Sequence, residues 1–154
     1  MDVEIKEMPE LRVGTVRHVG PYNLIYQAFE KLGTVAGLAV LFREGETRML
    51  AIHHDDPEST PLAELRSDAG LTMPAGAPLP SGLEEQRIAS GRYACTIHEG
   101  PYERLGDAWA RFMGEWLPHS GLRVGAGPSY EVYRNTPGSV PEDELRTELY
   151  IPLA

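Results

Sequence analysis

The sequence contains an internal duplication, and this feature restricts the possible fold more than any other. The segment Arg12–Tyr22 (RVGTVRHVGPY) recurs as Arg92–Tyr102 (RYACTIHEGPY), at an offset of 80 residues. The same offset carries 61–68 (PLAELRSD) onto 141–148 (PEDELRTE). Two segments that recur at one spacing predict that the chain is built from two related halves.

The two copies span 3–73 and 83–153, and the Pro- and Gly-rich segment 74–82 is predicted to link them. With 154 residues the chain has the size of one ordinary domain. Hydrophobic residues make up 42% and charged residues 24%, a balance typical of a folded globular protein. We therefore expect one domain over residues 1–154 in which each copy forms half.

Each copy shows the same order of secondary-structure signals. A strand pair or bent strand is followed by a helix that starts after a Gly-Pro pair, and two further strands follow the helix. The opening strands are expected at 3–19 and 85–98, the next strands at 48–54 and 129–134, and the last strands end at Leu71 and Leu153. This order predicts a tandem β-α-β-β repeat.

Apolar residues recur at helical spacing after each Gly-Pro pair. They are Ile25, Ala28, Phe29, Leu32, Val35 and Ala36 in the first copy, and Leu105, Ala108, Trp109, Phe112, Met113, Trp116 and Leu117 in the second. The pairs Gly37-Leu38 and Gly121-Leu122 are expected to end the helices. Because the apolar stripes of two such helices must be buried, we expect an α+β fold with both helices packed on one face of an antiparallel sheet. A pseudo-twofold axis would relate the halves, with a ligand groove between them.

The charge and the motifs exclude several classes of protein. With 14 basic and 23 acidic residues the net charge is −9, which argues against direct nucleic-acid binding and favours a cationic ligand or a basic protein partner. The single cysteine, Cys95, is expected to be buried and inert. The chain has neither an apolar run of membrane-spanning length nor a signal-peptide pattern, so we expect a cytoplasmic location and no membrane contact. The histidines lack metal-ligand spacing and no nucleotide fingerprint occurs, so no metal or cofactor is expected.

The motifs, in this order, resemble those of a known family. They are the paired His-x-Gly-Pro-Tyr segments at 18–22 and 98–102, the turn 55–57 leading to 65–68, and the ending 147–153. Together they resemble the GyrI-like domain, which is also the effector-binding part of AraC- and MerR-type multidrug regulators. The resemblance covers essentially the whole chain and leaves no residues for a DNA-binding module. It implies a stand-alone bacterial domain that binds bulky, flat, often cationic organic compounds between its repeats.

Glu131 is the leading candidate for a ligand-binding residue. It lies in the strand segment 129–133, and it matches the position where the resemblance places a buried carboxylate beneath the ligand. Its counterpart in the first copy is Ala51. A buried carboxylate in an aromatic cavity would attract a cation or act as a general acid or base; the alternative is an ordinary strand glutamate facing solvent.

Aromatic residues complete the predicted site. Phe29 and Trp109 occupy equivalent helix positions and would sandwich a flat ligand, or would belong to the core. Tyr133 shares a strand face with Glu131 under two-residue alternation, and its counterpart is His53. The remaining candidates stand at the helix starts or off the apolar stripe, and either line the groove or only support the turns: Tyr22, Tyr26 and Tyr102.

The resemblance to the GyrI-like domain implies three possible functions. The first is a binding protein that sequesters or senses a hydrophobic, cationic drug or toxin. The second is a hydrolase of strained cyclopropane-containing toxins, in which Glu131 would be the catalytic acid or base. The third is a gyrase-inhibitor type of protein that binds a topoisomerase through its acidic surface. The sequence leaves open the ligand's identity, turnover, the oligomeric state and which helix aromatics face the groove.

Overall fold

The computed structural model describes residues 1–35, 42–43 and 46–154. The chain divides into two compact units, and each is described by itself. Unit 1 contains Met1–Met8 and Ser90–Ala154, and unit 2 contains Pro9–Ala89. Within the described residues, no helix is long and apolar enough to cross a membrane.

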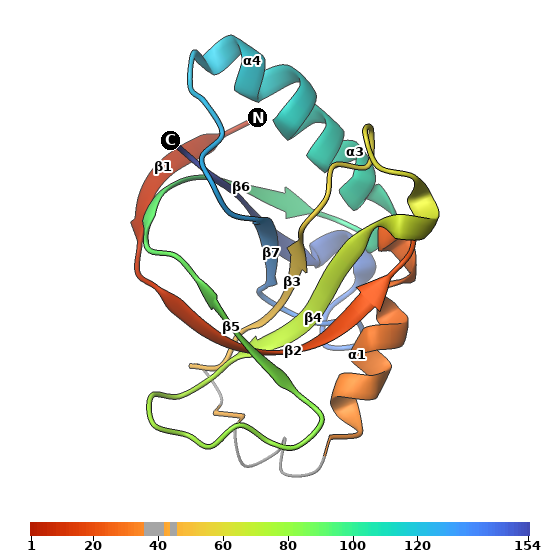
Figure 1. The fold of residues 1–154 in the computed structure, drawn as a ribbon. Coiled ribbons are helices and arrows are strands. Elements are labelled where there is room, and N and C mark those ends of the chain that lie inside the picture. Colours follow the sequence, from red (N-terminus) through yellow and green to blue (C-terminus); the bar gives the residue numbers. More distant parts are fainter. Residues whose placement is uncertain (36–41, 44–45) are drawn as a thin grey trace. The chain divides into compact units, whose positions relative to one another are not determined.

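Unit 1 is built on a four-stranded antiparallel sheet (Figure 1). Its strands, in spatial order, are β1 (Val3–Met8), β6 (Gly91–Glu99), β8 (Arg146–Pro152) and β7 (Ser129–Tyr133). A short 3-10 turn, η5 (Glu142–Glu144), leads into β8.

Unit 2 repeats this arrangement. Its antiparallel strands, in spatial order, are β5 (Glu84–Ile88), β2 (Leu11–Val19), β4 (Arg66–Thr72) and β3 (Met49–His53). The turn η2 (Leu62–Glu64) leads into β4 as η5 leads into β8. The α+β class with antiparallel sheets is therefore confirmed, and the groove and the twofold axis between the halves stay predictions.

The opening strand of each copy pairs in the sheet of the other copy. β1 pairs with β6, so that Val3 faces Thr96, and β5 pairs with β2, so that Glu84 faces Thr15. The stretches 3–19 and 84–99 thus each form two strands that do not pair with each other. Pro9 helps to explain this, because a two-residue hairpin turn needs positive φ angles that proline cannot adopt. Among the described residues only glycines have positive φ.

The helix of unit 2 covers one face of its sheet. The chain passes through η1 (Tyr22–Leu24) into α1 (Tyr26–Gly33), which packs against β2 and β4. The predicted apolar stripe is buried as expected: Ala28 and Leu32 enter a core with Ala69, Leu71, Met73 and Leu83, against which Ile25, Phe29 and Val35 pack. Ala36 and the Gly37-Leu38 pair lie outside the described residues.

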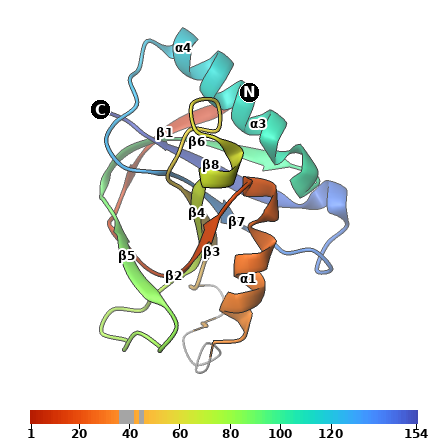
Figure 2. The ribbon, with the colours of Figure 1, turned by 45° about the vertical axis from the view of Figure 1, so that its right-hand side comes forward.

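The helical run of unit 1 is longer than that of unit 2 (Figure 2). It contains a π-helical turn. It comprises η3 (Tyr102–Arg104), α3 (Leu105–Arg111), the π-helical η4 (Phe112–Trp116) and α4 (Leu117–Ser120), and it ends at Gly121 with φ 75°. Pro118 explains the π-helical turn, since a proline in a regular helix would clash with the carbonyl four residues earlier. Ala108 and Phe112 pack against Ala94, Leu149 and Ile151 of the sheet.

Candidate functional site

The two faces of β7 carry different residues. Glu131 faces Leu149 in the register of β7 and β8, and Tyr133 faces Thr147. Leu149 belongs to the core beneath the helical run, so Glu131 and Tyr133 lie on the helix-covered face of the sheet. The alternation predicted for these two residues therefore places both side chains under α3.

The Glu131 carboxylate is buried and accepts hydrogen bonds from Trp109 and Tyr133. The residue is 5% exposed. The indole N–H of Trp109 donates to Oε2 at 2.8 Å, and the Tyr133 hydroxyl donates to Oε1 at 2.7 Å. Hydrogen bonds to an ionised acceptor are each worth about 1.5–3 kcal/mol. These two donors hold the carboxylate in position without adding positive charge.

Tyr102 extends the aromatic surroundings of the carboxylate. Its ring centroid is 5.3 Å from that of Tyr133, with 49° between the planes, and its hydroxyl donates to the Asn135 carbonyl at 3.4 Å. Burial, followed by the charge of Glu131, raises the pKa of both Tyr102 and Tyr133 above the usual tyrosine value. Both hydroxyls therefore stay protonated at neutral pH and remain hydrogen-bond donors.

A row of aromatic rings on the helical run supports Trp109. The centroids of Trp109 and Phe112 are 6.0 Å apart, and those of Phe112 and Trp116 are 5.6 Å apart. Phe112 is fully buried, so it fixes the helix on the sheet while Trp109 reaches β7. The π-helical turn begins at Phe112 and changes the phase of the helix between Trp109 and Trp116.

The equivalent place in unit 2 has an aromatic pair without a carboxylate. The rings of Tyr22 and His53 stack at 4.5 Å with 14° between their planes. The Tyr22 hydroxyl donates to the Asp55 carbonyl and accepts the Asp55 N–H at 3.0 Å. Ala51 stands in the position of Glu131 and is completely buried. Phe29, in the position of Trp109, has no N–H to donate and packs against the core.

The predicted site residues thus fall into three groups. Glu131, Tyr133, Trp109 and Tyr102 form one cluster in unit 1, which we call the Glu131 cluster. Tyr22 and His53 form a pair in unit 2. Phe29 packs against the core of unit 2, and Tyr26 is 53% exposed. A ligand role for the residues of unit 2 stays a prediction.

A second buried carboxylate, Asp68, was not among the predicted site residues. Its Oδ1 accepts from Arg17 at 2.7 Å, while Oδ2 accepts from Gln86 at 2.8 Å and lies against His54. Burial alone would raise the pKa of Asp68, but the hydrogen bonds from His54, Arg17 and Gln86 outweigh it and lower the pKa to about 2. The sequence offered one signal, because Asp68 ends the duplicated segment 61–68.

The counterpart of Asp68 in unit 1 is Glu148, with a similar environment. Arg134 donates to it at 2.5 Å and the Tyr150 hydroxyl at 2.7 Å. Tyr150 stacks on Tyr130 at 4.7 Å. In the register of the sheet these residues alternate with the core residues under the helical run, so they occupy the other sheet face. Both carboxylates are hydrogen-bonded to an arginine and to a neutral donor, which indicates a structural role.

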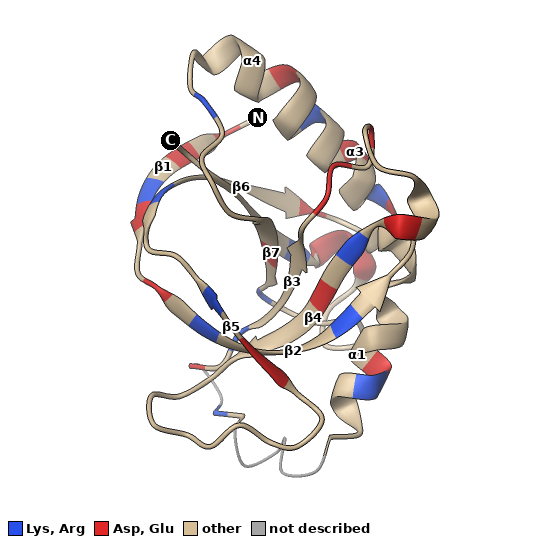
Figure 3. Ribbon diagram, viewed as in Figure 1, with Lys and Arg blue, Asp and Glu red and all other residues tan. Residues whose placement is uncertain are grey.

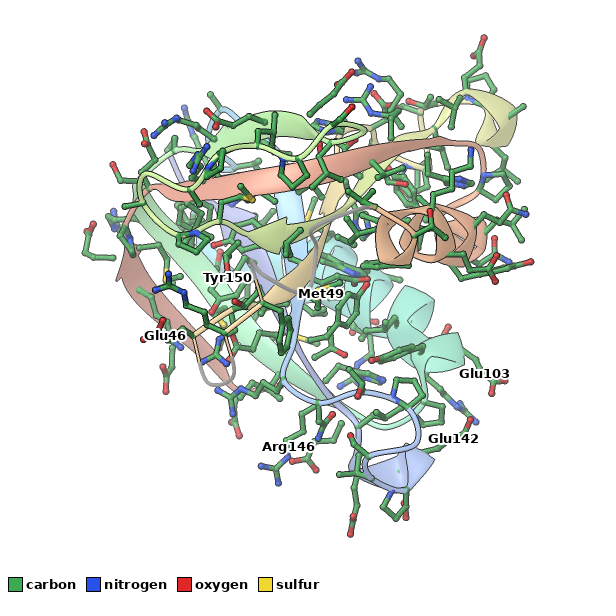
Figure 4. The ribbon with its side chains drawn as sticks, turned by 90° about the horizontal axis from the view of Figure 1, so that it is seen from below. Glu46, Met49, Glu103, Glu142, Arg146 and Tyr150 are labelled. Atoms are coloured by element: carbon green, nitrogen blue, oxygen red, sulfur yellow. The ribbon has the colours of Figure 1, made fainter. Side chains whose placement is uncertain are left out.

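A pocket of about 750 Å³ in unit 1 is lined by none of the four residues of the Glu131 cluster. It surrounds the end of β6 and includes side chains of β1, α3 and β8. One of them, Arg146 of β8, is labelled in Figure 4. Its charges are largely paired within the unit: Lys6 lies 3.8 Å from Glu4, and Arg146 lies 3.2 Å from Glu99. No group of three potential metal ligands occurs among the residues that the structure describes.

The chain is similar to known proteins in both sequence and structure. The DNA gyrase inhibitor of Erwinia billingiae (strain Eb661) is 29% identical over 164 residues, covering 100% of this chain and 98% of the relative. The EcmrR C-terminal domain has a TM-score of 0.82 at 19% identity, covering 99% of this chain and 97% of that one. SAV2435, in its structure bound to tetraphenylphosphonium, has a TM-score of 0.73 at 12% identity, covering 100% and 94%.

The two structural neighbours share the fold, because nearly all of each chain aligns at a high TM-score. At such low sequence identity the likeness shows the fold alone. The gyrase inhibitor adds similarity in sequence over the full length of this chain. A family model described as the GyrI-like small molecule binding domain matches residues 1–154. The chain therefore belongs to the GyrI-like family of small-molecule binding domains.

Proposed function

We propose that this protein binds a hydrophobic organic cation at the Glu131 cluster and thereby sequesters or senses it. The observation that carries the proposal is the buried carboxylate held by two neutral donors, Trp109 and Tyr133. Neither donor cancels its negative charge. A charge in surroundings of low polarity attracts an opposite charge more strongly than one in water, so a desolvated cation gains there.

The rings of the cluster suit the same class of ligand. Trp109, Tyr133 and Tyr102 present aromatic surfaces around the carboxylate. A cation over such a ring gains about 0.5–2 kcal/mol, and a flat apolar ligand gains from burial. The net charge of −9 attracts cations towards the protein as well. The structure of SAV2435 with tetraphenylphosphonium makes that compound a suitable first probe.

The test measures binding of tetraphenylphosphonium by calorimetry to the wild type and to Glu131→Gln. We expect the substitution to weaken binding at least tenfold, which corresponds to about 1.4 kcal/mol. Tetraphenylborate, an anion of almost the same shape, serves as the ligand control and should bind neither protein. Equal affinity of wild type and variant for the cation would refute the role of Glu131.

A hydrolase remains the second candidate because Tyr133 and Glu131 are directly hydrogen-bonded. A tyrosine hydroxyl 2.7 Å from a carboxylate forms a pair through which a proton can move during ring opening. Mass spectrometry of cyclopropane-bearing compounds after incubation with the protein distinguishes the two functions. A product formed by the wild type and absent with Glu131→Gln would assign hydrolysis.

A protein partner is the third candidate, suggested by the name of the gyrase-inhibitor relative. Acidic residues occur on strands, helices and turns of both units (Figure 3). This distribution makes the small-molecule site the stronger proposal. A salt-sensitive pull-down of a topoisomerase would reverse that order.

A further inference from the structure

Two buried hydroxyl groups have no hydrogen-bond partner among the described residues. They are the Oγ of Ser67 and the Oγ1 of Thr147, and both residues are completely buried. The two residues occupy the same place in the duplicated segments 61–68 and 141–148. Each copy thus keeps a hydroxyl where an apolar side chain of the same size would avoid an unsatisfied polar group.

Thr147 lies beside the Glu131 cluster. It faces Tyr133 across the β7–β8 pair and His98 across the β6–β8 pair. Leu149, two residues further along β8, faces Glu131 and lies in the core under the helical run. By strand alternation Thr147 therefore lies on the same sheet face as the Glu131 carboxylate. Side chains directly opposite each other on antiparallel strands are neighbours.

The other polar groups around Thr147 already have partners. The Tyr133 hydroxyl donates to Glu131, the Tyr102 hydroxyl donates to the Asn135 carbonyl, and Nε2 of His98 pairs with the Pro101 carbonyl at 3.2 Å. Thr147 is the hydroxyl in these surroundings with no partner among the described residues. It can both donate and accept a hydrogen bond.

We propose that Thr147 is a ligand-binding residue of the Glu131 cluster that selects for a hydrogen-bonding substituent on the ligand. This inference rests on the proposed function and narrows it. The ligand class becomes an aromatic cation that also carries a hydroxyl, carbonyl or amino group. The carboxylate binds the cationic centre, and Thr147 binds the polar substituent.

A matched pair of probes tests this selection. Tetraphenylphosphonium has no hydrogen-bonding group, and (4-hydroxyphenyl)triphenylphosphonium adds one phenolic hydroxyl to the same cation. Calorimetry at mildly acidic pH, where the phenol is neutral, gives the ratio of the two affinities. The wild type should prefer the hydroxyl compound by about 3- to 10-fold, the factor that one hydrogen bond supplies. Thr147→Val should bring the ratio close to one, and Thr147→Ser should restore it.

Ser67→Ala is the control, because it removes the equivalent hydroxyl in unit 2 and should leave the ratio as in the wild type. The assignment of Thr147 would be overturned if the affinity ratio of the two cations persists in Thr147→Val, or if it falls equally in Ser67→Ala. In either case, Glu131-dependent binding of both cations would still support the proposed function. Binding of neither cation by the wild type would overturn both proposals. Thermal unfolding of each variant establishes that it is folded before the ratio is interpreted.

Discussion

The hydrogen bond between Trp109 and Glu131 provides a quantitative test through a double-mutant cycle. Trp109→Phe removes the 2.8 Å bond to Oε2 and reproduces the residue found at the equivalent position, Phe29. A hydrogen bond to a charged group is worth about 1.5–3 kcal/mol, so we expect a loss of about 2 kcal/mol in the free energy of unfolding. Glu131→Ala, which reproduces Ala51, leaves the N–H of Trp109 and the hydroxyl of Tyr133 without this acceptor, and we expect it to cost about 2–4 kcal/mol.

The double variant Trp109→Phe/Glu131→Ala removes the donor and the acceptor together. It should therefore lose about 2 kcal/mol less than the two single losses combined, because the second substitution no longer breaks this bond. Urea unfolding at neutral pH measures each free energy, and thermal unfolding supports it, since 1 kcal/mol corresponds to about 2–4 °C for a chain of this size.

Trp116→Phe supplies the matched control for the cycle. Trp116 lies on the same helical run and packs on Phe112, so its replacement alters packing without removing a bond to Glu131. Combined with Glu131→Ala it should give additive losses within about 0.5 kcal/mol. If the losses of Trp109→Phe and Glu131→Ala are also additive, the carboxylate is not bound by the indole in solution, and the basis of the proposed site is wrong.

Two further predictions concern Asp68 and Gly70 of unit 2. The pKa of Asp68 is about 2 in the folded protein against 3.8 ordinarily, so its ionised form stabilises the fold. This contribution, about 2 kcal/mol, is fully present above about pH 4 and is lost as the pH falls through about 2. Asp68→Asn should therefore be less stable at neutral pH, and its acid unfolding should shift to higher pH. Gly70→Ala would bring a Cβ within 2.7 Å of a Val13 methyl carbon and should cost about 1–3 kcal/mol. In Gly106→Ala the new Cβ would have no atom within 4 Å beyond its chain neighbours and its own helix backbone, so this substitution should stabilise the helix by up to about 1 kcal/mol. Urea unfolding distinguishes the two variants, and equal effects would contradict the close packing of Gly70 against Val13.

The elements of the fold could be predicted because their signals are local and occur twice. The helix stripes, the Gly-Pro helix starts and the alternation in β7 each depend on neighbouring residues, and the duplication provides an independent copy of each. The sequence alone therefore predicts that Glu131 and Tyr133 share one strand face, and the register of β7 confirms it. The bond from Trp109 depends on the phase of a helix above a strand, which periodicity alone does not determine.

Strand pairing and the second carboxylate were harder to predict for a related reason. The alternation along a strand indicates which residues share a face, but it does not identify the neighbouring strand. The pairing of β1 with β6 and of β5 with β2 therefore could not be predicted from the local pattern. Asp68 acquires its partners through that pairing, because Gln86 comes from β5 and Arg17 from β2. Its role in the fold follows from contacts between distant segments.

The difference between the two copies indicates why the buried carboxylate is present. Unit 2 packs its helix on its sheet with Ala51 and Phe29 where unit 1 has Glu131 and Trp109, so this helix–sheet arrangement forms without a charge at that position. A buried carboxylate carries a desolvation cost that its hydrogen bonds only offset, whereas an alanine carries none. If folding alone determined this position, the Ala51 solution would suffice in both units. This difference between the copies supports the cation site proposed at Glu131. A Trp109→Phe/Glu131→Ala variant that folds but does not bind the cation would separate that proposed role from a role in stability.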